Sequence, residues 1–276
     1  MTTQVQKVVE KMVFRHTNAH VGRLISVTPE NSTNRHLAYG RIILNESVST
    51  VSFSNLDRET GFVVLQGEAD VCIGDESTKL RKFDSIYIPR NSSIQVSTSS
   101  TVDIAEFSAD VQHQYPLQIV RFAEISKDPG LVFSAGEGTQ ASRHLHMSLA
   151  KNIQAGRLVV GFTWSEPGNW TSWPPHEHTA MLEEMYVYFN MPAPAFGIQL
   201  VYDDTEYPEF LTVVREGDAV TMPSGYHPNV SVPGHRIGFL WAMAAHREVE
   251  DRKFGVVTVQ PGFDKGGSGL EKGQSK

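Results

Sequence analysis

Three histidines in the second half of the chain have the types and spacing of metal ligands. His176 and His178 lie two residues apart, and His227 follows in a Pro-Ser-Gly-Tyr-His-Pro turn. Side chains two apart on a strand project from the same face, because strand side chains alternate. A pair of carboxylates, Glu183 and Glu184, comes soon after His178. Three neutral imidazoles and one carboxylate suit one divalent ion, zinc or manganese first, with iron or nickel also suitable.

Strand alternation favours Glu184 over Glu183 as the carboxylate ligand. Glu184 shares one strand face with Tyr186 and Tyr188, whereas Glu183 shares the other face with apolar neighbours. Tyrosines suit a polar cavity, and apolar residues suit a face that packs against another sheet. Glu183 then remains as an alternative ligand or as a hydrogen-bond partner of a ligand histidine. The expected metal ligands are His176, His178, Glu184 and His227.

An ion with vacant coordination positions acts as a Lewis acid towards substrate oxygens, and a nearby side chain must then move a proton. The candidates for this catalytic role are Glu183, Tyr186, Tyr188 and Tyr226. The alternative for each tyrosine is packing in the core with its hydroxyl group hydrogen-bonded.

A second His-x-His pair stands in Ser142-Arg143-His144-Leu145-His146, and no carboxylate follows it closely. Two interpretations remain open for this segment. One histidine packs or forms hydrogen bonds near the junction of the two halves. Alternatively the segment binds substrate, with the planar guanidinium of Arg143 holding a carboxylate and His144 and His146 beside it.

The elements that must position these residues are short strands. Segments rich in Val, Ile, Phe and Tyr, such as Tyr39–Leu44 and Arg157–Trp164, alternate with turns rich in Gly, Asn, Asp and Ser. This pattern is typical of an all-β sandwich or barrel. Helix signals are weak, and only Thr2–Lys11 has the pattern of a short amphipathic helix.

The two halves of the chain also match each other. Phe83–Ile94 aligns with Gly217–Pro228, since each has an Asp, alternating apolar residues, then a Pro and a turn. Repeated units of this kind indicate a duplicated domain. Ser93 stands where the second half has His227, so the first copy is expected to be structural and without metal. We expect a first barrel over residues 1–125, a metal-binding barrel over 126–262 and a disordered tail over 263–276.

The charge and composition of the chain exclude several classes of partner. The 276-residue chain has a net charge of −7 and no basic stripe, which argues against nucleic acid and anionic membranes as partners. The single cysteine, Cys72, excludes an intrachain disulfide, and its strand context predicts a buried small side chain. The sequence has no signal segment and no apolar run long enough to span a membrane, so we expect a cytoplasmic protein.

Four segments carry a family resemblance: Arg157–Trp164, Pro167–His178, Leu182–Tyr186 and Pro223–Pro228. Together they resemble the 5-deoxy-glucuronate isomerase family of inositol catabolism, which is similar to the uronate ketol-isomerases of pectin breakdown. The resemblance is strong from about Gly136 to His246. Leu200 departs from it, because the family usually has an arginine there.

The resemblance implies an all-β bicupin, two jelly-roll-like β-barrels in one chain. It also implies a metal-dependent aldose–ketose isomerase that acts on a deoxy uronic acid, foremost 5-deoxy-glucuronate to 5-dehydro-2-deoxy-gluconate. The family pattern carried onto this sequence again selects Glu184 rather than Glu183. The alternatives are a cupin dioxygenase and a non-catalytic sugar-binding bicupin. Because open sheet edges need cover, we expect a homo-oligomer.

Overall fold

The computed structural model describes residues 11–263 and 269–274, and these residues are almost entirely strands and loops. The only named helical elements among them are α2 (Phe122–Ile125) and the 3-10 helix η2 (Glu271–Gly273). The predicted all-β class is therefore confirmed. The predicted helix Thr2–Lys11 lies outside the described residues except for its last residue. Within the described part of the chain, no helix is long and apolar enough to cross a membrane.

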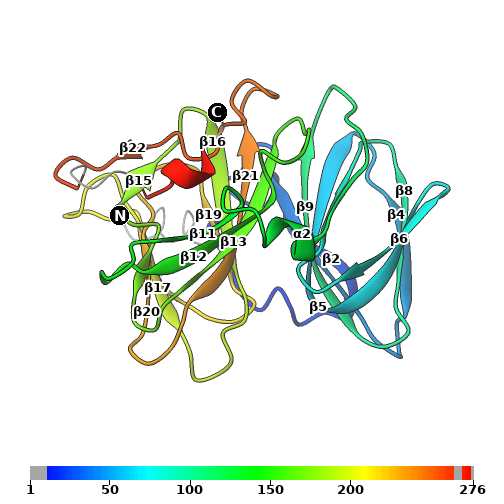
Figure 1. Ribbon diagram of the computed structural model, residues 1–276, viewed down its shortest axis with the longest axis horizontal. Coiled ribbons are helices and arrows are strands. Elements are labelled where there is room, and N and C mark those ends of the chain that lie inside the picture. Colours follow the sequence, from blue (N-terminus) through cyan, green and yellow to red (C-terminus); the bar gives the residue numbers. More distant parts are fainter. Residues whose placement is uncertain (1–10, 264–268, 275–276) are drawn as a thin grey trace.

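Two lobes lie side by side (Figure 1), and the N-terminal lobe covers residues 22–120. Its sheet runs in the order β10-β7-β5-β9-β3-β2, and β4, β6 and β8 join the sheet beside β5. Its strands are β2 (Gly22–Val27), β3 (Ala38–Leu44), β4 (Thr50–Ser54), β5 (Arg58–Ile73), β6 (Glu76–Arg81), β7 (Ser85–Ile88), β8 (Ser93–Ser97), β9 (Val102–Asp110) and β10 (Gln118–Val120).

The C-terminal lobe covers residues 132–259 and contains a seven-stranded sheet in the order β1-β19-β16-β21-β13-β12-β11. The strands of this sheet are β1 (Val13–Phe14), β11 (Val132–Ala135), β12 (Arg143–Leu149), β13 (Leu158–Ser165), β16 (Leu182–Tyr188), β19 (Ala219–Met222) and β21 (Gly238–Ala245). Two smaller sheets contain β14 (Trp170–Thr171), β17 (Gly197–Val201), β18 (Phe210–Val214) and β20 (Asn229–Ser231), and β15 (His176–Glu177) with β22 (Thr258–Val259).

Strand order repeats between the lobes, as the internal match of the sequence predicts. The series β7-β5-β9-β3-β2 in the first lobe corresponds to β19-β16-β21-β13-β12 in the second. In the first lobe Thr60 pairs with Ile88 on β7, and in the second Glu184 pairs with Met222 on β19. Ile88 and Met222 each precede the Pro of the matched segments. Thr60 therefore occupies the position that Glu184 has in the C-terminal lobe.

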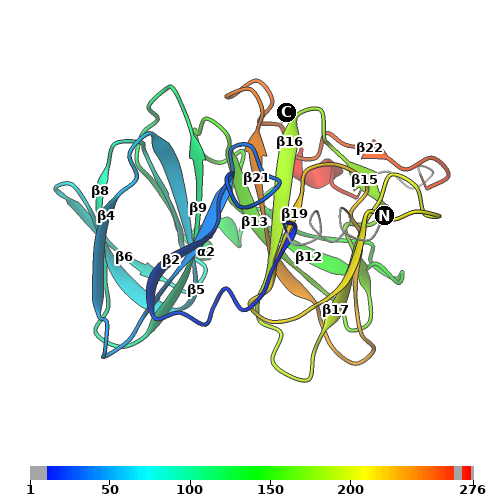
Figure 2. The same cartoon turned by 180° about the vertical axis from the view of Figure 1, so that it is seen from behind.

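Each lobe also receives an edge strand from the segment that precedes the other lobe. β1 pairs with β19, and β10 pairs with β7 in the corresponding register. Figure 2 shows the dark blue start of the chain passing from one lobe to the other. The expected first domain is thus corrected at its start, because Val13 and Phe14 belong to the C-terminal sheet. Equivalent ion pairs follow the two edge strands, Arg15 with Asp218 and Arg121 with Asp84.

One hydrophobic core joins the lobes. Tyr39 and Phe107 of the N-terminal lobe belong to the same buried cluster as Leu149 and Val160 of the C-terminal lobe, and a second cluster fills the N-terminal lobe alone. Cys72 does not enter either core. Its neighbours along the strand are buried, but Cys72 itself is half-buried on the opposite face, so the prediction of a buried side chain is wrong.

Part of the predicted disordered tail is packed. Gly269–Gln274 is described, and Leu270 is only 7% exposed. Leu270 belongs to the core that joins the lobes, and Gly273 lies against Phe254 and Phe133. The expectation of disorder over 263–276 is therefore corrected for Gly269–Gln274.

Candidate metal centre

Three predicted ligands converge inside the C-terminal lobe. The ligand atoms of His178, Glu184 and His227 all lie within 4.8 Å of one another, and all three residues are buried. The Nε2 atoms of His178 and His227 are each 3.0 Å from the same carboxylate oxygen, Oε2 of Glu184. His227 Nε2 is buried and, although 3.0 Å from that oxygen, is not aligned for a hydrogen bond to it and has no other partner. A cation among these atoms would satisfy it, so the donor set fits a divalent metal ion.

Backbone carbonyl groups orient the histidines. The Nδ1 atom of His178 lies 3.2 Å from the carbonyl oxygen of Leu182, and Nδ1 of His227 lies 2.8 Å from that of Gly225. The Nδ1 atom of His176 has the same kind of partner, since it lies 2.8 Å from the carbonyl oxygen of Pro174. A ring that donates its Nδ1–H to a carbonyl group presents its Nε2 lone pair, which is how metal-binding histidines are usually held.

The electrostatics of the group also suit a cation. Burial works to raise the pKa of Glu184, but its contacts with His178 and His227 outweigh burial and lower that pKa to about 2. Burial works to lower the pKa of His178, but Glu184 outweighs it and raises that pKa. Burial and the neighbouring His227 lower the pKa of His176 to about 3. The carboxylate is therefore ionised and His176 neutral at neutral pH, which are the forms in which these groups bind a metal.

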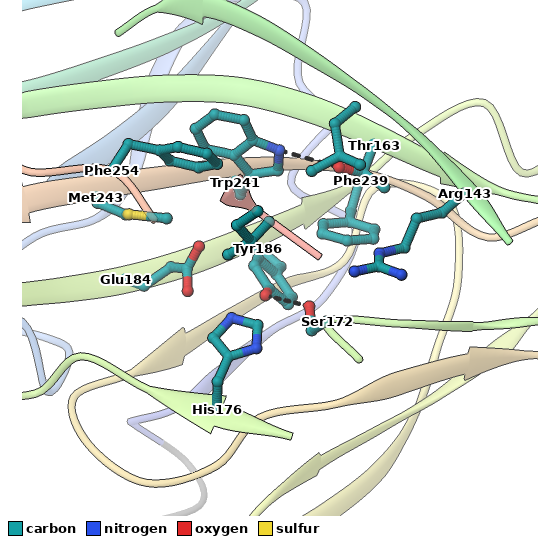
Figure 3. A pocket seen from close by; sticks show the side chains of 12 residues that line it. Arg143, Thr163, Ser172, His176, Glu184, Tyr186, Phe239, Trp241, Met243 and Phe254 are labelled. Carbon is teal, nitrogen blue, oxygen red and sulfur yellow. Dashed lines mark hydrogen bonds between the residues drawn. The ribbon is translucent and has the colours of Figure 1, made fainter. Parts of the chain in front are cut away.

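His176 stands beside this group but outside its closest set of atoms. Its ring centroid is 5.2 Å from that of His227 and 6.4 Å from that of His178. Figure 3 shows His176 and Glu184 directed into one cavity, with Tyr186 between them and Arg143 further along the wall. The cavity has a volume of about 40 Å³. The apolar part of its wall comes from Leu145, Phe239, Trp241, Met243, Phe254 and Leu270.

Two of the predicted site residues besides the ligands reach the cavity, Arg143 and Tyr186. The guanidinium of Arg143 donates to the carbonyl oxygens of Ala141 and Trp173, at 2.9 and 2.6 Å. The hydroxyl group of Tyr186 lies 2.5 Å from Oγ of Ser172. Burial lowers the pKa of Arg143 to about 10, so the group stays charged at neutral pH.

The remaining catalytic candidates lie elsewhere. Both carboxylate oxygens of Glu183 accept hydrogen bonds from backbone N–H groups of residues 35–37, which removes it from the list of proton carriers. Tyr188 is fully buried and donates its hydroxyl group to Gln199. Tyr226 packs its ring against Tyr202 and does not line the cavity.

His144 and His146, two predicted substrate-binding residues, do not line this cavity. On β12 Arg143 and Leu145 face the cavity, so alternation places the two histidines on the opposite face. His146 packs against both Phe162 and Trp164, which also stack on each other, and His144 lies between Ser134 and Glu166. The ring of His146 also contacts Phe122 in the segment that connects the lobes, as the interpretation of one histidine packing near the junction expects.

Several residues of the site had no local signal in the sequence. Ser172 and Leu270 come from a loop and from the tail, where no periodic pattern marks a cavity wall. Gln199 donates from Nε2 to the carbonyl oxygen of His227 at 3.0 Å, and so holds the backbone of a ligand. Phe239, Trp241 and Met243 have such a signal, because alternation along this strand places all three on one face.

Fold and site together define a class, the two-lobed cupin proteins with a buried His–Glu–His group. A cupin 2 conserved barrel domain protein from Leptotrichia buccalis is similar over 82% of this chain and 89% of its own, with a TM-score of 0.50 and 12% identity. An IolB-like protein from Salmonella typhimurium is similar over 92% of this chain and 98% of its own, with a TM-score of 0.80 and 23% identity. At such identities these similarities show the fold.

Sequence comparison gives the family. The family model described as the KduI/IolB family matches residues 12–256, and the chain belongs to that family. A relative from Geobacillus kaustophilus, named 5-deoxy-glucuronate isomerase, is 28% identical over 251 residues, which is 83% of this chain and 87% of the relative. The chain is an isomerase of this family, and the predicted family is confirmed.

Proposed function

We propose that the chain is a metal-dependent aldose–ketose isomerase that converts a deoxy uronic acid, foremost 5-deoxy-glucuronate, to its ketose, 5-dehydro-2-deoxy-gluconate. The observation that carries the proposal is the convergence of His178, Glu184 and His227 beside a cavity that also contains Arg143. The family supplies the reaction class, and the name of the Geobacillus relative supplies the substrate.

His178, Glu184 and His227 would hold the ion, with His176 as the fourth protein ligand. This set of imidazoles and one carboxylate favours zinc or manganese, and also suits iron or nickel. A bound divalent cation supplies Lewis-acid polarisation of substrate oxygens. Burial of all four side chains keeps bulk water from competing for the site.

Arg143 is the proposed anchor for the carboxylate of the substrate. Its side chain is buried, its hydrogen bonds go to two backbone carbonyl groups, and the negative charge of Glu271 acts on it. A buried guanidinium whose hydrogen bonds go to neutral carbonyl groups can also bind a ligand carboxylate, which its planar fork suits. The chain has Leu200 where the family usually has an arginine, so Arg143 is the cation that we assign to the substrate carboxylate.

Tyr186 is the proposed carrier of a proton at a substrate oxygen. Isomerisation moves one proton between neighbouring carbons and another between their oxygens. Burial raises the pKa of Tyr186 well above its ordinary value, so its hydroxyl group stays protonated and can donate. Its close contact with Ser172 offers a second hydroxyl group through which that proton can be exchanged.

The described cavity is smaller than the substrate. Pockets for small ligands commonly have volumes of about 300 Å³ or more, and about 40 Å³ is room for water only. Binding therefore requires an outward movement of the wall. The wall residues best placed to move are those outside the strands, which are Ser172, Phe254 and Leu270.

The test is to incubate zinc- or manganese-loaded protein with 5-deoxy-glucuronate and follow the ketone product by NMR. We expect product with a loaded protein and none after removal of the metal. No product at any metal loading, with other uronates also inert, would contradict the proposal. Oxygen uptake that appears only with a redox metal would instead indicate a dioxygenase.

A further inference from the structure

Glu183 is buried outside the cavity, and the metal centre does not explain why a carboxylate is buried there. The residue is 1% exposed, and its two oxygens accept the backbone N–H groups of Arg35, His36 and Leu37 at 2.7 to 2.8 Å. These donors precede β3 of the N-terminal lobe, whereas Glu183 lies on β16 of the C-terminal lobe. A single buried carboxylate thus fastens the lobes together through three charge-assisted hydrogen bonds.

Glu59 makes the same connection in the opposite direction. It lies on β5, the strand that corresponds to β16, and it immediately precedes Thr60 as Glu183 precedes Glu184. Its oxygens accept the backbone N–H groups of residues 156–158, at the start of β13, at 2.6 to 2.8 Å. Tyr87 donates a fourth hydrogen bond at 2.7 Å. The two carboxylates form a reciprocal clamp, which we define as Glu59 and Glu183 with these donors.

Only the Glu183 half of the clamp borders the metal centre. The residue before it, Leu182, supplies the carbonyl oxygen that orients His178, and the residue after it, Glu184, supplies the carboxylate. Glu183 therefore fixes the middle of a three-residue stretch whose two ends hold parts of the site. The corresponding residues around Glu59 are Arg58 and Thr60, and the N-terminal lobe has no group of metal-binding side chains among the described residues.

We propose that Glu183 is a positioning residue for the metal centre. By fixing β16 to the backbone of Arg35–Leu37, it holds Glu184 and His178 at the separation that a cation requires. The N-terminal lobe, which has Thr60 and Ser93 in place of two ligands, then serves the site as the rigid body to which β16 is attached. This inference rests on the proposed function, because it presupposes that the group binds a metal.

Glu59→Gln is the matched control for Glu183→Gln. In either variant the new amide group places its NH₂ against backbone N–H donors, so hydrogen bonds between the lobes are lost while shape is kept. Glu59 is as deeply buried and has one more partner, so its substitution should lower the melting temperature at least as much. A purely structural role predicts equal effects of the two variants on metal binding.

The measurement is the dissociation constant of zinc, determined by competition between the metal-free protein and a chromophoric chelator, alongside the melting temperatures of the metal-free proteins. We expect Glu183→Gln to weaken zinc binding by about 10-fold or more, the size of effect known for residues that orient ligands, and Glu59→Gln by less than about 2-fold. Both variants should melt at lower temperature than the unchanged protein.

Equal weakening by both variants, or unchanged zinc binding in folded Glu183→Gln, would overturn the inference while leaving the metal site intact. Absence of zinc binding by the unchanged protein would overturn the proposed function, and the inference with it. If Glu183→Gln does not fold, Glu183→Asp and Glu59→Asp replace the pair. These variants keep the charge but shorten the reach, and the same difference in zinc binding is expected between them.

Discussion

At the scale of single residues, two adjacent glutamates on β16 have different roles because strand side chains alternate. Glu184 points towards His178 and His227, and Glu183 points towards the other lobe. Alternation predicted this separation from the sequence and selected the ligand that the structure places in the group. What alternation does not reveal is the partner of the second carboxylate, because its donors come from residues 35–37, far away in the sequence.

Arg143→Met should weaken substrate binding without removing the metal. Loss of charge-assisted hydrogen bonds to a carboxylate is worth roughly 1.5–3 kcal/mol, which corresponds to an increase in KM of about 10- to 100-fold. Steady-state kinetics with the uronate measures this change, and elemental analysis checks that the metal remains. A neutral substrate analogue without the carboxylate is the control, since its KM should not change. An unaltered KM for the uronate would contradict the role of Arg143.

Gln199→Leu should weaken metal binding although Gln199 touches no metal. Gln199 accepts the hydroxyl group of Tyr188 at 2.5 Å and donates to the carbonyl oxygen of His227 at 3.0 Å. Without these bonds the backbone of His227 is held less firmly, and we expect the zinc affinity to fall by about 10-fold. Chelator competition measures the affinity, with the exposed Gln95→Leu as control. Equal affinities of the two variants would exclude this role.

At the scale of elements, the two faces of β12 have different roles: one lines the cavity and the other packs against neighbouring aromatic rings. Arg143 lines the cavity, whereas the ring centroid of His146 lies 4.5 Å from that of Phe162 and 4.7 Å from that of Trp164. The sequence predicts that Arg143 and the two histidines point to opposite faces but not which face is inside. That choice depends on how β12 pairs with β11 and β13, which is a long-range property.

His146 should make stability sensitive to acid. Burial, and secondly the charge of His144, lowers the pKa of His146 from 6.5 to about 4. As the pH falls below 6.5, the unfolded chain binds a proton that the folded chain does not, so stability is lost between these pKa values. The loss from this group at about pH 4.5 is roughly 2 to 3 kcal/mol.

Urea unfolding at neutral and acidic pH tests this prediction. His146→Phe keeps an aromatic ring in the stack but has no titrating group, so the free energy of unfolding of the variant should fall less on acidification than that of the unchanged protein. His20→Phe is the control, because His20 is exposed and its substitution leaves both His146 and His144 in place. If the free energy of unfolding falls equally on acidification for His146→Phe and for the unchanged protein, His146 is not the source of the acid sensitivity.

At the scale of the whole molecule, duplication explains much of what the sequence predicts. The repeated segment Phe83–Ile94 and Gly217–Pro228 indicates two similar lobes, and the strand orders agree. The exchange of β1 and β10 was not predictable, because two- and three-residue edge strands have no periodic pattern of their own. The burial of Leu270 was also not predictable, because its short segment has no periodic pattern and the cavity that it lines is formed by the rest of the fold. The homo-oligomer stays a prediction.

The C-terminal lobe should not fold without the N-terminal one. A fragment of residues 126–276 lacks β1, the Arg15 partner of Asp218 and all three donors to Glu183. It also exposes the core that the lobes share, and buried carboxylates left without partners are costly. We expect no cooperative thermal transition by circular dichroism, in contrast to the full chain. A fragment that melts cooperatively and binds zinc would show that the lobes are independent.

The metal content of purified protein is the most direct test of the central claim that His178, Glu184 and His227 form a metal centre. His178→Ala removes a ligand, whereas His144→Ala removes a histidine of the other His-x-His pair that lies outside the cavity. The account predicts about one divalent ion per chain in the unchanged protein and in His144→Ala, and none in His178→Ala. Equal metal content in the two variants, or no metal in the unchanged protein even after incubation with zinc or manganese, would contradict it.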